Sequence, residues 1–455
     1  MMVRTMIYVL FLLAGVCNSS GTVKVGNKVV VIGGGFGGLY SAIKTAEKYP
    51  ALDVTLIDTK DKFVFLPLLY ELVTGAATAE EVAPSFESLL KDSPVTFVQG
   101  RVNDVNMNTK TISYEEINSS SSQIASSSST IATTLNYDQL VIAAGAQARL
   151  EVPGAKEFAL PFYTVEDAYN LQLQLRSAIS NAESDGREMV RVVVVGGGYS
   201  GVETATSIAN YLGKSRAVVS LVDRNSRIMT TSPESNRQAS EKALLSFGVS
   251  INSNTDVKEV LPDGVLLETK DEDFNTRNFV MPADLVIYTA GMKQTDLVTS
   301  CLCKDLDTNE YGRIRTSRTL QTLKYPEVFA IGDCASVENS FIPSTAQVAM
   351  QQSEILSSNV GLRYEFVSRN EDNEPLSRYL EKFTYVPLGE MLTLGGANAA
   401  ISSLNDNVKI AGPAASAARR LVYSYRMPTS SQQFKAFTGA IQSTLTPFLS
   451  SGRRK

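Results

Sequence analysis

Residues 29–58 read VVVIGGGFGGLYSAIKTAEKYPALDVTLID, which is the pattern of a strand, a glycine-rich turn, a helix and a second strand. Three glycines stand in G-x-G-x-x-G register at the turn: Gly33, Gly35 and Gly38. They permit a tight turn, close approach of a pyrophosphate and close packing of the helix on the strand. Asp58 ends the second strand, where a carboxylate accepts hydrogen bonds from a ribose hydroxyl. A bare glycine fingerprint also occurs in ordinary strand–helix turns, but the agreement of strand, helix and acid predicts dinucleotide binding.

The same unit recurs in residues 191–209, RVVVVGGGYSGVETATSIA. Its glycines take the same register: Gly196, Gly198 and Gly201. The next strand ends in LVDR, which makes Asp223 the second distal acid. LVIAAGA around Gly145 also recurs as LVIYTAG ending at Gly291, and small residues there let the backbone pass close to a dinucleotide. Two repeats in the same order predict an α/β fold of two nested Rossmann-like domains, the second inserted into the first.

This order sets the expected domain boundaries. The first dinucleotide-binding domain should span residues 28–155 and 310–385, and the second residues 156–309. Residues 117–134 are rich in serine and carry too little apolar surface to pack, so we expect a surface insertion there. Residues 386–455 are expected to form a separate, membrane-associating C-terminal region.

The composition argues against several classes of chemistry. The chain contains 47 acidic and 42 basic side chains, which does not indicate a nucleic-acid surface, and it has no histidine. No two of its four cysteines form a C-x-x-C pair, so no metal, iron–sulfur or disulfide-relay site is expected. Disulfide reductases with two dinucleotide domains carry a cysteine pair near residues 62–77, and this chain has none there. A flavin is therefore the expected electron store.

Two further segments carry candidate site residues. VFAIGDCAS, residues 328–336, brings Gly332 and Asp333 to an expected helix start. Asp333 is placed to accept hydrogen bonds from the ribityl hydroxyls of a flavin, although an aspartate there also serves as a plain N-cap. The following PSTAQVAMQQSEIL puts Gln347 and Gln351 on one face of a helix. By composition alone, such glutamines are more often solvated than functional.

Both ends of the chain have patterns of their own. In residues 1–20, Arg4 precedes an apolar run at 7–16 and small residues follow, which favours a signal peptide over an uncleaved anchor. Residues 417–427 interleave arginines with tyrosines, and apolar side chains then recur at helical spacing before the basic end RRK. An amphipathic helix of this kind suits a membrane interface. The alternative is a helix that docks on the protein's own core or on a dimer partner.

Taken together, the chain resembles the type II NAD(P)H:quinone oxidoreductases, also called alternative NADH dehydrogenases. The resemblance rests on GGGFGGLY, FVFLPLLYEL, GGGYSGVE, FAIGDCA and TAQVAMQQ. It implies that the first fingerprint holds FAD and the second NAD(P)H. It also implies that Gln347 and Gln351 line a quinone pocket beside the flavin, and that Glu203 lies near the nicotinamide and quinone sites as a proton or charge relay. The tail most resembles the plastid branch, the demethylphylloquinone reductases.

The expected activity is transfer of hydride from NAD(P)H to FAD and of two electrons to a membrane quinone of the plastoquinone, naphthoquinone or ubiquinone type. The resemblance implies a peripheral membrane protein in an organelle reached through the N-terminal signal, with a plastid favoured over a mitochondrion. A homodimer is left open. The alternatives are a flavoprotein redox sensor and a sulfide- or disulfide-type reductase, and the missing cysteine pair disfavours the second.

Overall fold

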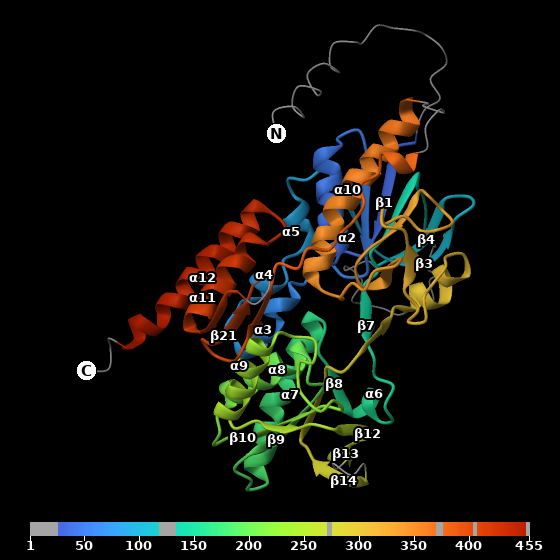
Figure 1. The fold of residues 1–455 in the computed structure, drawn as a ribbon. Helices are drawn as coiled ribbons and strands as arrows, with labels where there is room; N and C mark the ends of the chain where they lie inside the picture. The colour runs from blue at the N-terminus through green and yellow to red at the C-terminus, as the bar shows by residue number, and fades with distance from the viewer. Residues whose placement is uncertain (1–25, 118–132, 271–274, 370–375, 404–406, 452–455) are drawn as a thin grey trace, which may run out of the picture.

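The computed structural model describes residues 26–117, 133–270, 275–369, 376–403 and 407–451, with side chains to residue 441 (Figure 1). The expected signal segment, residues 1–20, and most of the serine-rich insertion lie outside the described residues. Two lobes, each built on its own sheet, lie at opposite ends of the molecule, and the C-terminal helices flank their junction (Figure 1).

The first lobe contains a seven-stranded sheet in the order β18-β6-β1-β2-β3-β4-β5. Its strands are β1 (Lys28–Ile32), β2 (Asp53–Asp58), β3 (Thr96–Asn106), β4 (Thr111–Glu116), β5 (Thr133–Asn136), β6 (Gln139–Ile142) and β18 (Val328–Ala330). The first five in the sheet order run parallel, and β3 to β5 form an antiparallel meander. Because β18 comes from far along the sequence, the chain returns to this sheet after building the second lobe.

Both faces of the parallel sheet are covered, as the continuous apolar strand predicts. In β1, Val29 and Val31 join one hydrophobic cluster, while Val30 and Ile32 join another on the opposite face. Helices α2 (Phe36–Lys48) and α10 (Ala346–Arg369) pack together on one side of the sheet (Figure 1).

The second lobe contains a five-stranded parallel sheet in the order β11-β10-β9-β15-β8. Its strands are β8 (Ala159–Pro161), β9 (Val190–Val195), β10 (Ala217–Val222), β11 (Ser250–Asn252) and β15 (Leu285–Tyr288). Its helices are α6 (Ala155–Phe158), α7 (Val165–Ser184), α8 (Tyr199–Leu212) and α9 (Glu234–Ser246), and its antiparallel meander is β12 (Thr255–Leu261), β13 (Gly264–Lys270) and β14 (Thr276–Pro282). Thr164 caps α7 through a reciprocal capping box with Asp167, which explains the sharp start of that helix.

The chain crosses between the lobes through a two-stranded antiparallel ribbon of β7 (Ala146–Ala148) and β16 (Met292–Gln294). A second contact between the lobes comes from α3 (Leu69–Thr74), which packs on α7 and α8. Shorter elements complete the first lobe: 3₁₀ turns at Leu66–Leu68, Leu302–Lys304, Gly332–Cys334 and Leu376–Arg378, helices α4 (Ala79–Val82) and α5 (Phe86–Leu90), a π-turn at Leu297–Cys301, and the parallel pair β17 (Ile314–Thr316) and β19 (Ala335–Val337).

The C-terminal region forms a small antiparallel sheet followed by two helices. The sheet is β20 (Glu390–Thr393), β21 (Ala399–Ser402) and β22 (Lys409–Gly412), and the helices are α11 (Pro413–Tyr425) and α12 (Ser430–Ser451). β20 packs on α8 and β21 on α9, whereas α12 contacts α4, so this region touches both lobes. Within the described residues, none of the helices combines the length and apolar character that a membrane crossing requires.

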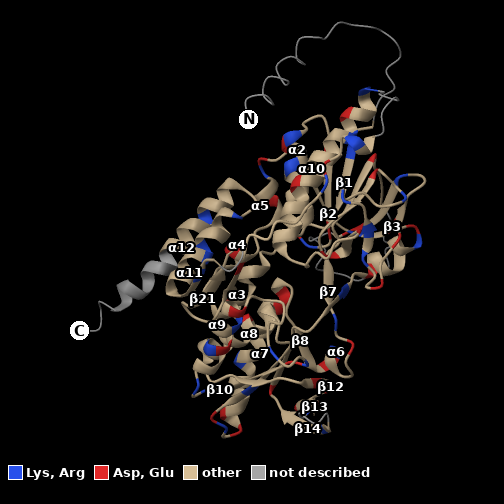
Figure 2. Ribbon diagram, viewed as in Figure 1, with Lys and Arg blue, Asp and Glu red and all other residues tan. Residues whose placement is uncertain are grey.

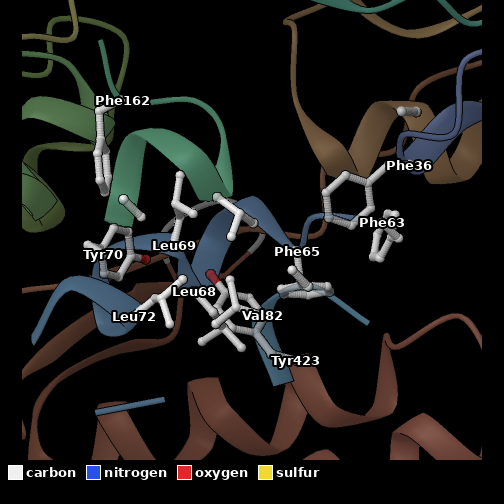
Figure 3. Packing of buried hydrophobic residues seen from close by; sticks show 14 of the residues in the cluster. Phe36, Phe63, Phe65, Leu68, Leu69, Tyr70, Leu72, Val82, Phe162 and Tyr423 are labelled. Carbon is white, nitrogen blue, oxygen red and sulfur yellow. The ribbon is translucent and has the colours of Figure 1, made fainter. Parts of the chain in front are cut away.

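Aromatic side chains join the C-terminal region to the first fingerprint. Phe36, the first residue of α2, packs against Phe63 and Phe65, with ring centroids 5.0 and 5.3 Å away. Phe65 in turn lies 5.4 Å from the ring of Tyr423 on α11 (Figure 3). Edge-on contacts of this kind fix the rings in one arrangement, so α11 and the start of α2 are held in a defined relation.

Candidate functional site

The turn after β1 is shaped by two tight contacts and one open position. Gly33 has a φ of 99°, in the left-handed region, and a Cβ on Gly38 would lie 1.8 Å from the Gly33 carbonyl oxygen. At Gly35, the N-cap of α2, a Cβ would meet nothing within 4 Å. The free N–H groups of the first turn of α2 face this space, which is the geometry that receives a phosphate.

Asp58 lies against this turn. Its carboxylate accepts hydrogen bonds from the backbone N–H of Gly34 at 2.5 Å and of Lys60 at 2.7 Å. Burial raises the pKa of Asp58, and these bonds oppose the rise. The side chain is therefore held in one orientation beside the open position.

The second turn repeats the first in detail. Gly196 has a φ of 108°, a Cβ on Gly201 would lie 1.7 Å from the Gly196 carbonyl oxygen, and a Cβ on Gly198 would meet nothing within 4 Å. Asp223 accepts from the backbone N–H of Gly197 and, at 2.7 Å, from that of Asn225. The repeat in the sequence is thus a repeat of the same turn and the same carboxylate contacts.

Gly145 and Gly291 occupy equivalent places in the two lobes. Gly145 follows β6 and Gly291 follows β15, and both have positive φ values, 63° and 82°. A Cβ on Gly145 would meet nothing within 4 Å, and one on Gly291 would lie 3.6 Å from the Arg149 side chain. Each glycine leads directly into one strand of the β7–β16 ribbon, so both lie where the chain passes between the lobes.

Gly332 and Asp333 begin a one-turn 3₁₀ helix that follows β18. The Gly332 N–H donates to the side-chain oxygen of Gln352 at 2.7 Å, and Gln352 is only 2% exposed. Burial raises the pKa of Asp333 and the charge of Arg313 lowers it. Of the residues that the structure describes, none donates a hydrogen bond to the Asp333 carboxylate, which leaves this acceptor available to ligand hydroxyls.

Gln347 and Gln351 hold the segment of residues 385–389. The Gln351 amide pairs with both the N–H and the carbonyl of Val386, at 3.0 and 2.8 Å. The Gln347 oxygen accepts from the Tyr385 hydroxyl at 2.8 Å and from the Leu388 N–H at 3.0 Å, and its nitrogen donates to Gly389 at 3.3 Å. The two glutamines therefore lie on one face, as predicted, and that face binds a defined part of the chain.

Glu203 is a buried carboxyl between the second lobe and the C-terminal region. It accepts from the Tyr70 hydroxyl at 2.8 Å and from the Thr393 N–H at 2.9 Å. Burial raises the pKa of Glu203 to about 7, against the lowering effect of these two hydrogen bonds. Thr393 ends β20, which directly follows the segment held by Gln347 and Gln351, so all three predicted residues border one continuous stretch, 385–393.

Close to Glu203 lies an ion pair that the sequence does not predict. Arg419 on α11 is 1% exposed and donates to Glu71 on α3, and Arg420 binds the other oxygen of the same carboxylate. The Arg419 guanidinium also lies 5.1 Å from the centre of the Tyr423 ring. Arg419 and Tyr423 are four residues apart on the buried face of α11, and this spacing is visible in the sequence. That Arg419 pairs with Glu71 is not visible in the sequence. The sequence also does not predict that Gln352 accepts from the Gly332 N–H.

The C-terminal helices combine a docked face with an exposed one. On one face of α11, Arg419 and Tyr423 are buried, so this face packs on the protein's own core. Such packing is the alternative to a membrane interface that the sequence left open. Apolar side chains remain exposed on α11 and α12: Leu421, Tyr425, Phe434, Phe437 and Ile441. No Asp or Glu occurs after residue 406, so the charged side chains in the described part of α11 and α12 are all Lys or Arg (Figure 2).

Comparison with known proteins places this arrangement in a family. The family model for pyridine nucleotide-disulphide oxidoreductases matches residues 27–353. A demethylphylloquinone reductase from Synechocystis sp. is 35% identical over 89% of this chain and 93% of its own length. An alternative NAD(P)H-ubiquinone oxidoreductase, chloroplastic/mitochondrial, from Arabidopsis thaliana is 33% identical over 94% of this chain and 86% of its own length.

A solved structure has the same fold. NDH2 from Plasmodium falciparum superposes with a TM-score of 0.78 at 18% identity, covering 92% of this chain and 98% of that one. The matched family model, the two relatives and the duplicated turn agree with one another. The chain therefore belongs to the pyridine nucleotide-disulphide oxidoreductase family, and within it to the type II NAD(P)H:quinone oxidoreductases.

Proposed function

We propose that the protein is an FAD-dependent oxidoreductase that oxidises NAD(P)H and reduces a membrane quinone without pumping protons. The observation that carries this proposal is the duplicated turn, in which Gly35 and Gly198 each leave space at a helix N-terminus. Two such turns suit two dinucleotides. Of the relatives named above, one is named as a demethylphylloquinone reductase and the other as an NAD(P)H-ubiquinone oxidoreductase. The chemistry that bound FAD would supply is acceptance of hydride from the dihydronicotinamide and transfer of two electrons to the quinone.

The first turn is the proposed FAD site. Gly35 leaves room for the pyrophosphate, and Asp58 is held where it can bind the adenosine ribose. The Asp333 carboxylate, to which no described residue donates, is the acceptor for ribityl hydroxyls. Gly332 belongs to this site through its bond to Gln352, which fixes the 3₁₀ turn that carries Asp333. In this proposal, the FAD-binding domain is the one expected from the sequence at residues 28–155 and 310–385.

The second turn is the proposed NAD(P)H site. Asp223 is fixed by two backbone N–H groups beside Gly198, and a fixed carboxylate favours the 2′-hydroxyl of NADH. Arg224 follows it and is exposed, so it can pair with the 2′-phosphate of NADPH. We expect a preference for NADH together with measurable use of NADPH.

The stretch 385–393 is the proposed wall of the quinone site. Gln347 and Gln351 orient its first half, and Glu203 binds its last residue, Thr393. Quinone reduction consumes protons, and a carboxyl with a pKa of about 7 can hold and release one near neutral pH. Glu203 is therefore assigned the role of proton donor to the site.

The exposed face of α11 and α12 is the proposed membrane contact. Burying the side chains of Phe434, Phe437 and Ile441 in a bilayer removes apolar surface from water, and the local excess of Lys and Arg favours anionic lipids. Peripheral association follows from a docked helix pair of this kind. The cyanobacterial and chloroplastic relatives support a plastid as the compartment.

The deciding experiment is steady-state NAD(P)H oxidation by the purified protein with and without a soluble quinone, with the visible spectrum recorded. We expect a flavin spectrum and turnover that depends on quinone. A redox sensor would be reduced once and would not turn over, and that result would overturn the proposal. Turnover with sulfide in place of NAD(P)H would instead support the sulfide-type reductase.

A further inference from the structure

A cluster of ionisable side chains surrounds Glu203 where the two lobes meet the C-terminal region. α8 supplies Glu203 itself, α3 supplies Tyr70 and Glu71, and α11 supplies Arg419 and Tyr423. Glu71, Glu203 and Arg419 are all less than a tenth exposed. Figure 3 shows Tyr70 on α3 and Tyr423 above α11 in this packed interior.

Three neighbouring elements, α3, β20 and α11, contribute to the electrostatic environment of Glu203. From α3, the Tyr70 hydroxyl donates a hydrogen bond to Glu203, and the charge of Glu71 raises the pKa of Glu203. From β20, the Thr393 N–H donates to Glu203 and lowers its pKa. From α11, the Arg419 charge lowers the pKa of Glu203. The remaining neighbours are Tyr423 on α11, Tyr199 on the same helix as Glu203, and Glu390 beyond Tyr199.

Arg419 and Glu71 act on Glu203 with opposite signs, although they are bonded to each other. Both lie in an interior where water and salt screen charges poorly, so each charge interacts with the other ionisable groups of the cluster. Arg420 binds the same Glu71 carboxylate, but its side chain is 17% exposed against 1% for Arg419, so solvent screens its charge more. The C-terminal helix therefore contributes one buried positive charge, that of Arg419, to the cluster around Glu203.

We propose that Arg419 is a positioning residue of the quinone half-reaction, and that through its pair with Glu71 the helix α11 sets the charge that Glu203 carries during turnover. This inference rests on the proposed function, because it gives Glu203 a role there. It makes the C-terminal helix part of the reaction chemistry in addition to its contact with the membrane. Movement of α11 would change the proton affinity of Glu203.

The competing explanation is that the pair only fastens α11 to α3. The two explanations differ in the sign of one measurement. If the pair only anchors α11 to α3, Arg419→Gln and Glu71→Gln break the same contact and should change the pKa of Glu203 in the same direction. If the charges matter, Arg419→Gln removes a positive charge and raises the pKa of Glu203, whereas Glu71→Gln removes a negative charge and lowers it.

The test is a pH titration of the flavin-loaded protein, followed by the infrared band of the protonated carboxyl that disappears in Glu203→Gln. We expect the midpoint to move up by about one pH unit in Arg419→Gln and down by a similar amount in Glu71→Gln. Arg419→Lys, which keeps the charge, should stay near the parent midpoint. Arg420→Gln is the matched control, with a smaller shift because its side chain is partly solvated.

A single variant that leaves a buried charge unpaired could fail to fold, so the double variant Arg419→Gln/Glu71→Gln is included. It replaces the ion pair by two amides, and its midpoint should return toward that of the parent because the two effects cancel. Shifts of the same sign in both single variants, or no shift in either, would overturn the proposal. If the shifts occur but Glu203→Gln leaves quinone reduction unchanged, the electrostatic coupling stands and the proposed role of Glu203 fails.

Discussion

Two glycines three residues apart in the first turn should respond to substitution in opposite ways. A Cβ at Gly38 would lie 1.8 Å from the Gly33 carbonyl oxygen, while ordinary contact begins near 3.4 Å. Gly38→Ala therefore has to push α2 away from the end of β1 by roughly 1.5 Å, which a close-packed interior resists. We expect the free energy of unfolding to fall by about 3 kcal/mol.

Gly35→Val should have almost no effect on the empty protein. Gly35 has φ −73° and ψ −167°, which any residue adopts, and nothing lies within 4 Å of its added Cβ. We expect the free energy of unfolding without flavin to stay within about 0.5 kcal/mol of the parent. Flavin binding should be lost, because the side chain fills the space proposed for the pyrophosphate.

The assay compares the two variants after flavin removal and after reloading. Denaturant unfolding of the flavin-free proteins isolates the packing effect, because bound flavin would itself add stability. Visible absorbance after reloading then gives flavin per chain. Full flavin occupancy in Gly35→Val, or unchanged unfolding in Gly38→Ala, would refute the reasoning. Gly198→Val is the matched control in the second turn, and it should lose NADH binding while keeping its flavin.

Three further predictions address the donor, the quinone and the membrane. Asp223→Asn removes the charge that repels a 2′-phosphate, so the ratio of NADPH to NADH activity in steady-state assays should rise; an unchanged ratio would place the specificity acid elsewhere. Gln347→Leu loses all three bonds to residues 385–389, each worth about 0.5–1.5 kcal/mol, so rapid mixing should show near-normal flavin reduction by NADH and reoxidation by quinone slowed at least about tenfold. Equal slowing of both half-reactions would contradict that assignment. Replacing Phe434 and Phe437 by serine removes two exposed apolar side chains worth about 1.5 kcal/mol or more each, so binding to anionic liposomes should weaken about a hundredfold while flavin content stays normal. Binding equal to the parent's would show that another face meets the membrane.

Features set by local spacing could be predicted from the sequence. The turn at Gly33 depends on residues within one strand–turn–helix unit, and its glycine spacing encodes both the left-handed backbone and the close contact at Gly38. The positions of Asp58 and Asp223 follow from the same spacing, because an acid at the end of the second strand has a fixed place in the unit. The internal repeat extended this reasoning to the relation between the lobes, since β18 does rejoin the first sheet.

Features that depend on contacts between distant segments could not be predicted. Helical spacing put Gln347 and Gln351 on one face of α10, but it could not show that this face meets residues 385–389, or that Gln352 beside them binds Gly332. Arg419 was interpreted as part of a cationic surface. Its partner Glu71 lies on α3, and only the folded chain brings the two together.

The ribbon of β7 and β16 brings the two ends of the second lobe together. The second lobe leaves the first through β7 and returns through β16, whose Met292 pairs with Ala148. The two ends of the second lobe are therefore neighbours, and a whole domain can be inserted between adjacent points without disturbing either core. The second lobe can therefore be exchanged as a unit through a single joint, the β7–β16 ribbon, while the first lobe keeps its own sheet.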